Sequence, residues 1–132
     1  MPSLEERKRS APRSINAAHA LTGFFLIMDA WGVEPQTARA ILGAPSASTY
    51  FAWRRGRAAR LSHDTLQRIG YIAGIYKALQ IVYSDAKQAD TWVQRPNRAF
   101  GDQPPLRRMA AGDITDLAAV RAYLDAARAP WS

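Results

Sequence analysis

Apolar residues recur at helical spacing along most of this chain, and Pro and Gly fall mainly between the periodic stretches. No stretch combines β-branched residues with strict alternation of apolar and polar positions, so strands are not expected. The pattern therefore predicts an all-α fold. The expected helices cover about 17–31, 35–42, 46–55, 63–83, 85–94 and 105–111, with a last helix from 113 or 115.

Two of these helices are expected to form the core. The 17–31 helix carries one apolar stripe, formed by Leu21, Phe24, Phe25, Met28 and Trp31. The 63–83 helix is apolar on more than one side, so it should lie between two layers as the shared spine of two subdomains. Gly70 and Gly74 lie one turn apart on this helix and would let a neighbouring helix approach closely.

The segment 34–56 is typical of a helix-turn-helix. Two short helices are joined by a tight turn of Gly43, Ala44 and Pro45, and Ser46 is positioned to cap the second helix. In this motif the first helix braces the second, whose amino-terminal end enters the major groove of DNA. Helical proteins that bind no DNA also contain such pairs, so periodicity alone leaves both interpretations open.

The charge distribution favours the DNA interpretation. The formal net charge is +7 and the isoelectric point is about 10.4, which suits a polyanionic partner, either nucleic acid or an acidic membrane surface. No acidic residue lies between Glu34 and Asp64. This segment nevertheless holds five arginines, namely Arg39, Arg54, Arg55, Arg57 and Arg60.

The candidate DNA contacts are arginines and short hydroxyl residues of this segment. Arginine suits phosphates, and the hydroxyl residues suit phosphates or base edges, although serines at a helix start also act as caps. The candidates are Arg39, Ser46, Ser48, Thr49, Arg54, Arg55 and Arg57. Trp53 is expected to be buried, whereas the pattern does not decide which way Tyr50 and Phe51 face.

Composition argues against several classes of function. The chain has no cysteine, which excludes disulfides and Cys-rich zinc sites and fits a reducing cytoplasm. His19 and His63 lie far apart with no carboxylate cluster at ligand spacing, so no metal is expected. Neither a glycine-rich phosphate loop nor a Ser/His/Asp arrangement is visible. We therefore expect no cofactor, no catalytic residue and no enzymatic activity.

No targeting or membrane segment is expected either. The first residues alternate acid and base, so 1–16 is predicted to be a flexible polar tail rather than a signal peptide. The longest apolar run, 24–28, is far shorter than the roughly 20 residues that cross a bilayer.

The second half of the chain carries a family resemblance. A Trp at 92 is followed by Pro96-Asn97, Phe100-Gly101, Pro105-Leu106 and a glycine at 112. This pattern resembles the toxin-binding domain of Xre/MbcA/ParS-like antitoxins. The first half is similar to the helix-turn-helix of the same family at Ile41-Leu42-Gly43, Thr49-Tyr50, 53–56 and 61–69. Arg39 departs from general helix-turn-helix patterns, which place a small residue four positions before the turn glycine, and Gln103-Pro104 before Pro105 is a local variant.

The resemblance implies an antitoxin of a type II toxin-antitoxin system that binds operator DNA as a homodimer. Its usual partner is a RES-domain toxin that consumes NAD, held in a hetero-oligomer. The implied toxin-contact residues are Pro96, Asn97, Arg121, Tyr123, Arg128 and Trp131. Pro96 and Asn97 are better suited to fixing a turn, and Trp92 and Phe100 are expected in the core. The expected domains are a helix-turn-helix over 17–83 and a toxin-binding domain over 84–132.

Two other interpretations remain open at this stage. The chain also fits a stand-alone helix-turn-helix transcription regulator whose second domain dimerises or senses a ligand. A hydrolase or transferase using the scattered aspartates has little support, because those residues suit caps and surfaces.

Overall fold

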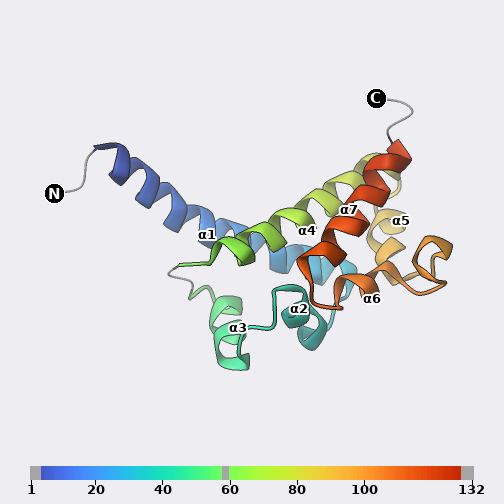
Figure 1. Ribbon diagram of the computed structural model, residues 1–132, viewed down its shortest axis with the longest axis horizontal. Helices are drawn as coiled ribbons and strands as arrows, with labels where there is room; N and C mark the ends of the chain where they lie inside the picture. The colour runs from blue at the N-terminus through green and yellow to red at the C-terminus, as the bar shows by residue number, and fades with distance from the viewer. Residues whose placement is uncertain (1–3, 58–59, 129–132) are drawn as a thin grey trace.

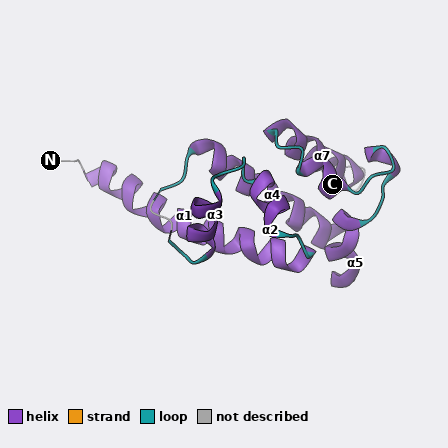
Figure 2. Ribbon diagram, turned by 90° about the horizontal axis from the view of Figure 1, so that it is seen from below, coloured by secondary structure: helices purple, strands orange, loops and turns teal. Residues whose placement is uncertain are grey.

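A computed structural model describes residues 4–57 and 60–128, and its fold is all-α, as the sequence predicts (Figures 1 and 2). The α-helices are α1 (Leu4–Trp31), α2 (Pro35–Ile41), α3 (Ala47–Arg54), α4 (His63–Val82), α5 (Ala86–Thr91), α6 (Pro105–Met109) and α7 (Ile114–Arg128). Two short 3₁₀ helices, η1 (Trp92–Gln94) and η2 (Arg98–Phe100), lie between α5 and α6. Within the described residues there is no strand, only an isolated antiparallel bridge between Asn97 and Gln103.

The first helix is longer than predicted. Residues 4–16, expected to form a polar tail, continue α1, and Figure 1 shows this part projecting from the body of the protein. The segment has no apolar stripe, so hydrophobic periodicity gave no signal for a helix there. Once 17–31 is helical, each residue added in front of it gains a backbone hydrogen bond, except where Pro12 has no N–H to donate.

The centre of the fold is α4, which packs against α1 and also against α5 and α7. Ile72, Ile75 and Leu79 on this helix are completely buried. The buried residues of both halves of the chain form one continuous hydrophobic cluster. The prediction of a helix that serves as a shared spine is therefore confirmed.

The two short helices α2 and α3 are joined by a left-handed turn. Gly43 and Ala44 have φ angles of +92° and +58°, and Gly56 turns the chain after α3 with a φ of +86°. Tyr50 is buried, with its ring edge-on to Phe25 of α1 at 5.5 Å between centroids. This contact anchors one side of α3 on α1.

The region after α4 is more broken than predicted. The expected helix over 85–94 divides into α5 and η1, and the helix expected over 105–111 ends at Met109. The turn-rich segment also contains η2, which the sequence pattern did not predict. Asn97 begins η2 by accepting a hydrogen bond from the backbone N–H of Ala99 at 2.9 Å, a local signal without apolar periodicity.

Candidate functional site

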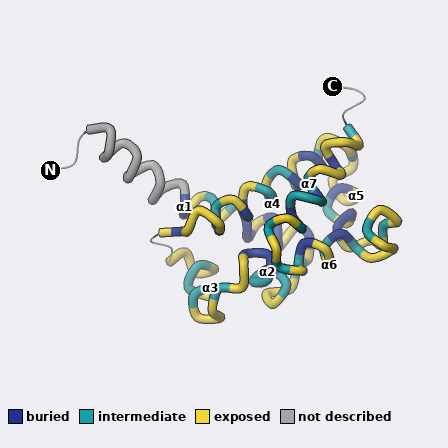
Figure 3. Tube along the Cα trace, in the orientation of Figure 1, coloured by how far each residue is buried: buried dark blue, intermediate teal, exposed yellow. Residues whose placement is uncertain are grey.

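One side of α3 is exposed, as expected for the recognition helix of a helix-turn-helix. In Figure 3 this helix projects from the body of the protein. Ser48 is exposed, Thr49 is half-buried, and Phe51 is 45% exposed. Trp53, expected to be buried, is half-buried against the core. The orientation left open by the sequence is thereby settled, with Tyr50 in the core and Phe51 at the surface.

Ser46 caps α3. Its hydroxyl oxygen accepts the backbone N–H of Thr49 at 3.2 Å, and its hydroxyl also donates to the Thr49 hydroxyl at 2.9 Å. The cap satisfies one of the free N–H groups at the helix start. Ser48 makes a longer hydroxyl contact with Ser46, at 3.3 Å, and remains accessible from outside.

Arg54 is tied to α1 instead of standing free. It donates a hydrogen bond to the Asp29 carboxylate at 2.8 Å, and its guanidinium lies 4.9 Å from the centroid of the Phe25 ring. With 40% of the side chain exposed, this ion pair holds α3 against α1. The predicted role in phosphate contact therefore competes with a structural role at this residue.

The remaining basic candidates form no ion pair among the side chains that the structure describes. Arg55 and Arg57 follow α3 directly and are exposed. Neither has a carboxylate partner among the side chains that the structure describes, those of residues 17–57 and 60–128. Arg39 lies in the last turn of α2, half-buried, and its backbone carbonyl accepts the N–H of Ala44. The structure thus places two exposed cations at the end of α3 and a third, less exposed one on α2.

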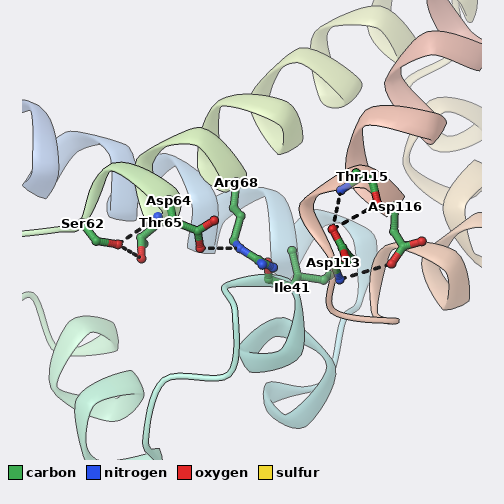
Figure 4. A network of polar contacts seen from close by, with 8 residues as sticks. All are labelled: Ile41, Ser62, Asp64, Thr65, Arg68, Asp113, Thr115 and Asp116. Carbon is green, nitrogen blue, oxygen red and sulfur yellow. Dashed lines mark hydrogen bonds and ion pairs between the residues drawn. The ribbon is translucent and has the colours of Figure 1, made fainter.

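A buried arginine that the sequence analysis did not select as a site residue joins α4 to α2 (Figure 4). Arg68 of α4 is 8% exposed and donates to the Asp64 carboxylate at 2.8 Å and to the Ile41 carbonyl at 3.3 Å. A Cβ added at Gly43 would lie 3.1 Å from its Nε atom. The Asp64–Arg68 spacing of four residues was the available signal, since such pairs meet on a helix face.

The start of α7 lies at the same junction. Asp113 accepts hydrogen bonds from the backbone N–H and the hydroxyl of Thr115, both at 3.0 Å. The hydrogen bond from the Thr115 N–H lowers the pKa of Asp113 most, and the positive charge of Arg68 also contributes to lowering this pKa. Asp116 accepts from Arg108 at 2.6 Å and so ties α6 to α7. Arg68 is therefore bonded to the end of α2, and its charge also acts on the carboxylate of Asp113 before α7.

An aromatic cluster occupies the second half. The ring of Tyr123 on α7 is stacked on Trp92 at 6.1 Å and meets Phe100 edge-on at 5.3 Å. Trp92 is buried and Phe100 is half-buried against the core, as predicted. Tyr123 is 39% exposed, so the cluster reaches the surface at this residue.

The other predicted toxin-contact residues have different surroundings. Pro96 is exposed, and Asn97 caps η2, which is the turn role expected of this asparagine. Arg128 is half-buried at the end of α7, and Trp131 lies outside the described residues.

Arg121 is half-buried and already has partners within the protein. Its Nε donates to both carboxylate oxygens of Asp125 at 3.1 Å. A Cβ added at Gly74 would lie 1.5 Å from a guanidinium nitrogen of Arg121, so this glycine makes room for the arginine. The expected close approach is therefore confirmed at Gly74, whereas nothing lies within 4 Å of the corresponding point at Gly70.

Comparisons with known proteins agree with this division of the chain. Residues 11–74 match the family model described as the antitoxin Xre-like helix-turn-helix domain. Residues 78–129 match the antitoxin Xre/MbcA/ParS C-terminal toxin-binding domain. The chain is also 36% identical over 126 residues to the uncharacterized protein y4oB of Sinorhizobium fredii (strain NBRC 101917 / NGR234), covering 94% of this chain and 97% of that protein.

The chain belongs to the Xre/MbcA/ParS antitoxin family. It is thus the antitoxin of a toxin-antitoxin system, and its partner is a toxin. No solved structure matches the chain. The two family matches meet within α4, so this antitoxin uses one helix in both of its functional parts.

The antitoxin family is not a known enzyme family. Among the described residues, no group of three or more His, Cys, Asp or Glu residues is arranged to hold a metal ion. His19 and His63 are both exposed. None of the described helices is long and apolar enough to cross a membrane.

Proposed function

We propose that this antitoxin represses its own operon by binding operator DNA as a homodimer, and that it neutralises a RES-domain toxin that degrades NAD. The observation that carries the DNA part is the exposed α3 in a segment with five arginines and no acidic residue. Two copies of α3 would read two half-sites about one helical turn apart. A cytoplasmic location belongs to the same proposal, because operator DNA lies there.

The proposed DNA contacts follow from exposure. Ser48 and Thr49, near the start of α3, are the candidates for base edges or phosphates, while Ser46 supports them as the cap. Arg55 and Arg57 are the leading phosphate contacts, since both are exposed. Arg39 and Arg54 are the weaker candidates, because Arg39 is half-buried and Arg54 is paired with Asp29.

The type of toxin rests on the family resemblance. The proposed toxin contacts on the last helix are Tyr123 and Arg128, followed by Trp131 in the carboxy-terminal tail. Arg and Trp are common anchors in protein interfaces. Arg121 is a poorer candidate because its guanidinium packs over Gly74 and pairs with Asp125.

Co-expression tests neutralisation. The product of the adjacent reading frame is expressed alone and with the antitoxin, and growth, cellular NAD and co-purification are measured. We expect growth arrest with NAD loss for the toxin alone, and recovery with co-purification when the antitoxin is present. Failure of both rescue and co-purification would overturn the antitoxin function, and arrest without NAD loss would exclude a NAD-degrading toxin. A gene without a toxin-encoding neighbour would favour the stand-alone regulator.

Salt dependence tests DNA binding. A substitution that removes one arginine–phosphate interaction should make the slope of log affinity against log salt shallower by about 1. We expect this change for Arg57→Ala and a smaller one for Arg54→Ala, measured on operator DNA. Lys77→Ala is the matched control, because Lys77 is exposed on α4, outside the 34–64 segment. A slope unchanged by Arg55→Ala and Arg57→Ala would contradict the assigned face.

A further inference from the structure

The loop between η1 and α6 is held by its own hydrogen bonds. The N–H of Asn97 donates to the Gln103 carbonyl at 3.1 Å, and the N–H of Asp102 donates to the Asn97 carbonyl at 3.0 Å. Gly101 and Asp102 are both left-handed, with φ angles of +65° and +63°. Two consecutive left-handed residues, one of them not glycine, are held in place by this closed set of bonds. The loop is therefore a preformed projection (Figure 1).

An aromatic base supports this projection. Phe100 in η2 packs edge-on against Tyr123, and Tyr123 rests on the buried ring of Trp92. The exposed part of Tyr123 is thus fixed in orientation before any partner binds. Rigid aromatic side chains of this kind lose little conformational entropy on binding, which suits them to the centre of an interface.

Arginines precede and follow Phe100 in the sequence. The segment 95–108 contains four arginines, no lysine and one acidic residue, Asp102. Arg108 is paired with Asp116. The other three have no carboxylate partner among the described residues, and all three are exposed; they are Arg95, Arg98 and Arg107. Protein interfaces are enriched in arginine and depleted of lysine, so this composition is typical of a contact surface.

Two of these arginines are already positioned. The Arg95 guanidinium lies 6.0 Å from the centroid of the Tyr83 ring and donates to the Gln88 carbonyl at 3.3 Å. Arg107 donates to the Gln103 side-chain oxygen at 2.8 Å. The side chain of Arg98 makes no hydrogen bond or ion pair with the described residues, which leaves its full charge available to a partner.

We propose that these side chains form one toxin-contact surface that binds an acidic patch with an apolar centre on the toxin. This arginine–tyrosine surface consists of Arg95, Arg98, Phe100, Arg107 and Tyr123. The inference rests on the proposed neutralisation of a toxin by direct binding, and it names the chemistry that the toxin must present. Charge complementarity at such a surface sets specificity and the association rate.

A protein partner explains this surface better than DNA does. Figure 1 and Figure 2 both show the loop at the end of the long axis opposite the amino-terminal part of α1, whereas α3 lies near the middle of this axis, so the loop is set apart from α3. The surface also contains the aromatic side chains of Phe100 and Tyr123 beside its cations. A phosphate backbone has no apolar group for these two rings to pack against. Finally, the surface falls within 78–129, the part that matches a toxin-binding domain.

Charge reversal at Arg98 tests the surface, because this side chain supports no internal contact. Binding is measured by calorimetry with the purified product of the adjacent reading frame, at low and at high salt. We expect Arg98→Glu to raise Kd about tenfold and Arg98→Glu with Arg107→Glu to raise it about a hundredfold. The effect should shrink at high salt. Lys77→Glu, an equal charge change on α4, should leave Kd unchanged.

The outcomes separate the two proposals. If the unaltered antitoxin does not bind the product, the proposed neutralisation fails and this inference fails with it. If the unaltered antitoxin binds while the Arg98 and Arg98/Arg107 variants bind equally well, only the surface is overturned. Loss of operator binding with full toxin binding in the same variants would assign the surface to DNA instead. Unchanged thermal unfolding of each variant, measured beforehand, shows that the comparison is between folded proteins.

Discussion

Glycines in this protein have separate physical roles that substitution can distinguish. Gly43 is left-handed and faces the buried Arg68, whereas Gly70 is in the middle of α4 with open space where a Cβ would go. Of the two, a side chain is disfavoured only at Gly43, both by the left-handed backbone and by the nearby guanidinium of Arg68. Gly74 is an intermediate case, because the atoms in the way belong to the flexible end of Arg121.

We predict opposite effects on stability for two alanine substitutions. Gly70→Ala should raise the free energy of unfolding by about 0.5 to 1 kcal/mol, because alanine favours a helix interior. Gly43→Ala should lower it by about 1 to 3 kcal/mol, because it forces a left-handed alanine against Arg68. Urea denaturation followed by circular dichroism measures both. Equal effects of the two substitutions would contradict the assigned roles.

Arg68 shows how a buried residue can position the helix-turn-helix. It satisfies the Ile41 carbonyl at the end of α2 and lies near Asp113 at the start of α7. Because its side chain is buried, removing it would leave both Asp64 and this carbonyl without their partner. The position of the turn before α3 thus depends on a side chain from the spine.

At the scale of elements, two serines at the start of α3 have different roles. Ser46 and Ser48 are two residues apart and chemically identical, but only Ser46 accepts the backbone N–H that caps the helix. Ser48 is exposed and caps nothing. The pair therefore gives a matched comparison within one helix.

We predict that Ser46→Ala lowers the free energy of unfolding by about 1 kcal/mol through loss of the cap. Ser48→Ala should leave stability within about 0.5 kcal/mol of the parent protein. Operator affinity should nevertheless fall for Ser48→Ala if Ser48 touches DNA. Thermal unfolding and a binding titration of both variants check this, and unaltered operator affinity for Ser48→Ala would remove this residue from the DNA contacts.

The elements also show what sequence could reveal. Helices with an apolar stripe, such as α4 and the second half of α1, were predictable, because a buried helix face requires apolar residues at helical spacing in the sequence. Residues 4–16 and η2 were not, because neither has that period.

The candidate site, too, was only partly predictable from the sequence. Charge patterning pointed to the arginines after α2, but the pairing of Arg54 with Asp29 joins residues 25 positions apart, which spacing does not reveal.

At the scale of the whole molecule, one core serves both functional parts. Leu124 of α7 is buried in the same hydrophobic cluster as Phe24 of α1. We predict that Leu124→Ala destabilises the entire protein by about 2 to 5 kcal/mol, because less apolar surface is buried and a cavity remains. Hydrogen exchange should then speed up in α1 as well as in α7.

Leu26→Ala is the control for this prediction. Leu26 also lies on α1, but it is 65% exposed, so its truncation should leave the exchange rates of α7 unaltered. Faster exchange confined to α7 in the Leu124→Ala variant would mean that the two parts unfold independently.

The shared spine also bears on how such antitoxins diversify. A recombination breakpoint between the two family matches, at residues 75–77, would cut α4 beside Ile72 and Ile75, both completely buried. A breakpoint after α4 would instead combine α4 of one antitoxin with α7 of another. The packing of Arg121 over Gly74 would then be lost. The helix-turn-helix part and the toxin-binding part of such antitoxins should therefore be inherited together, with compensating changes along α4 whenever either part changes.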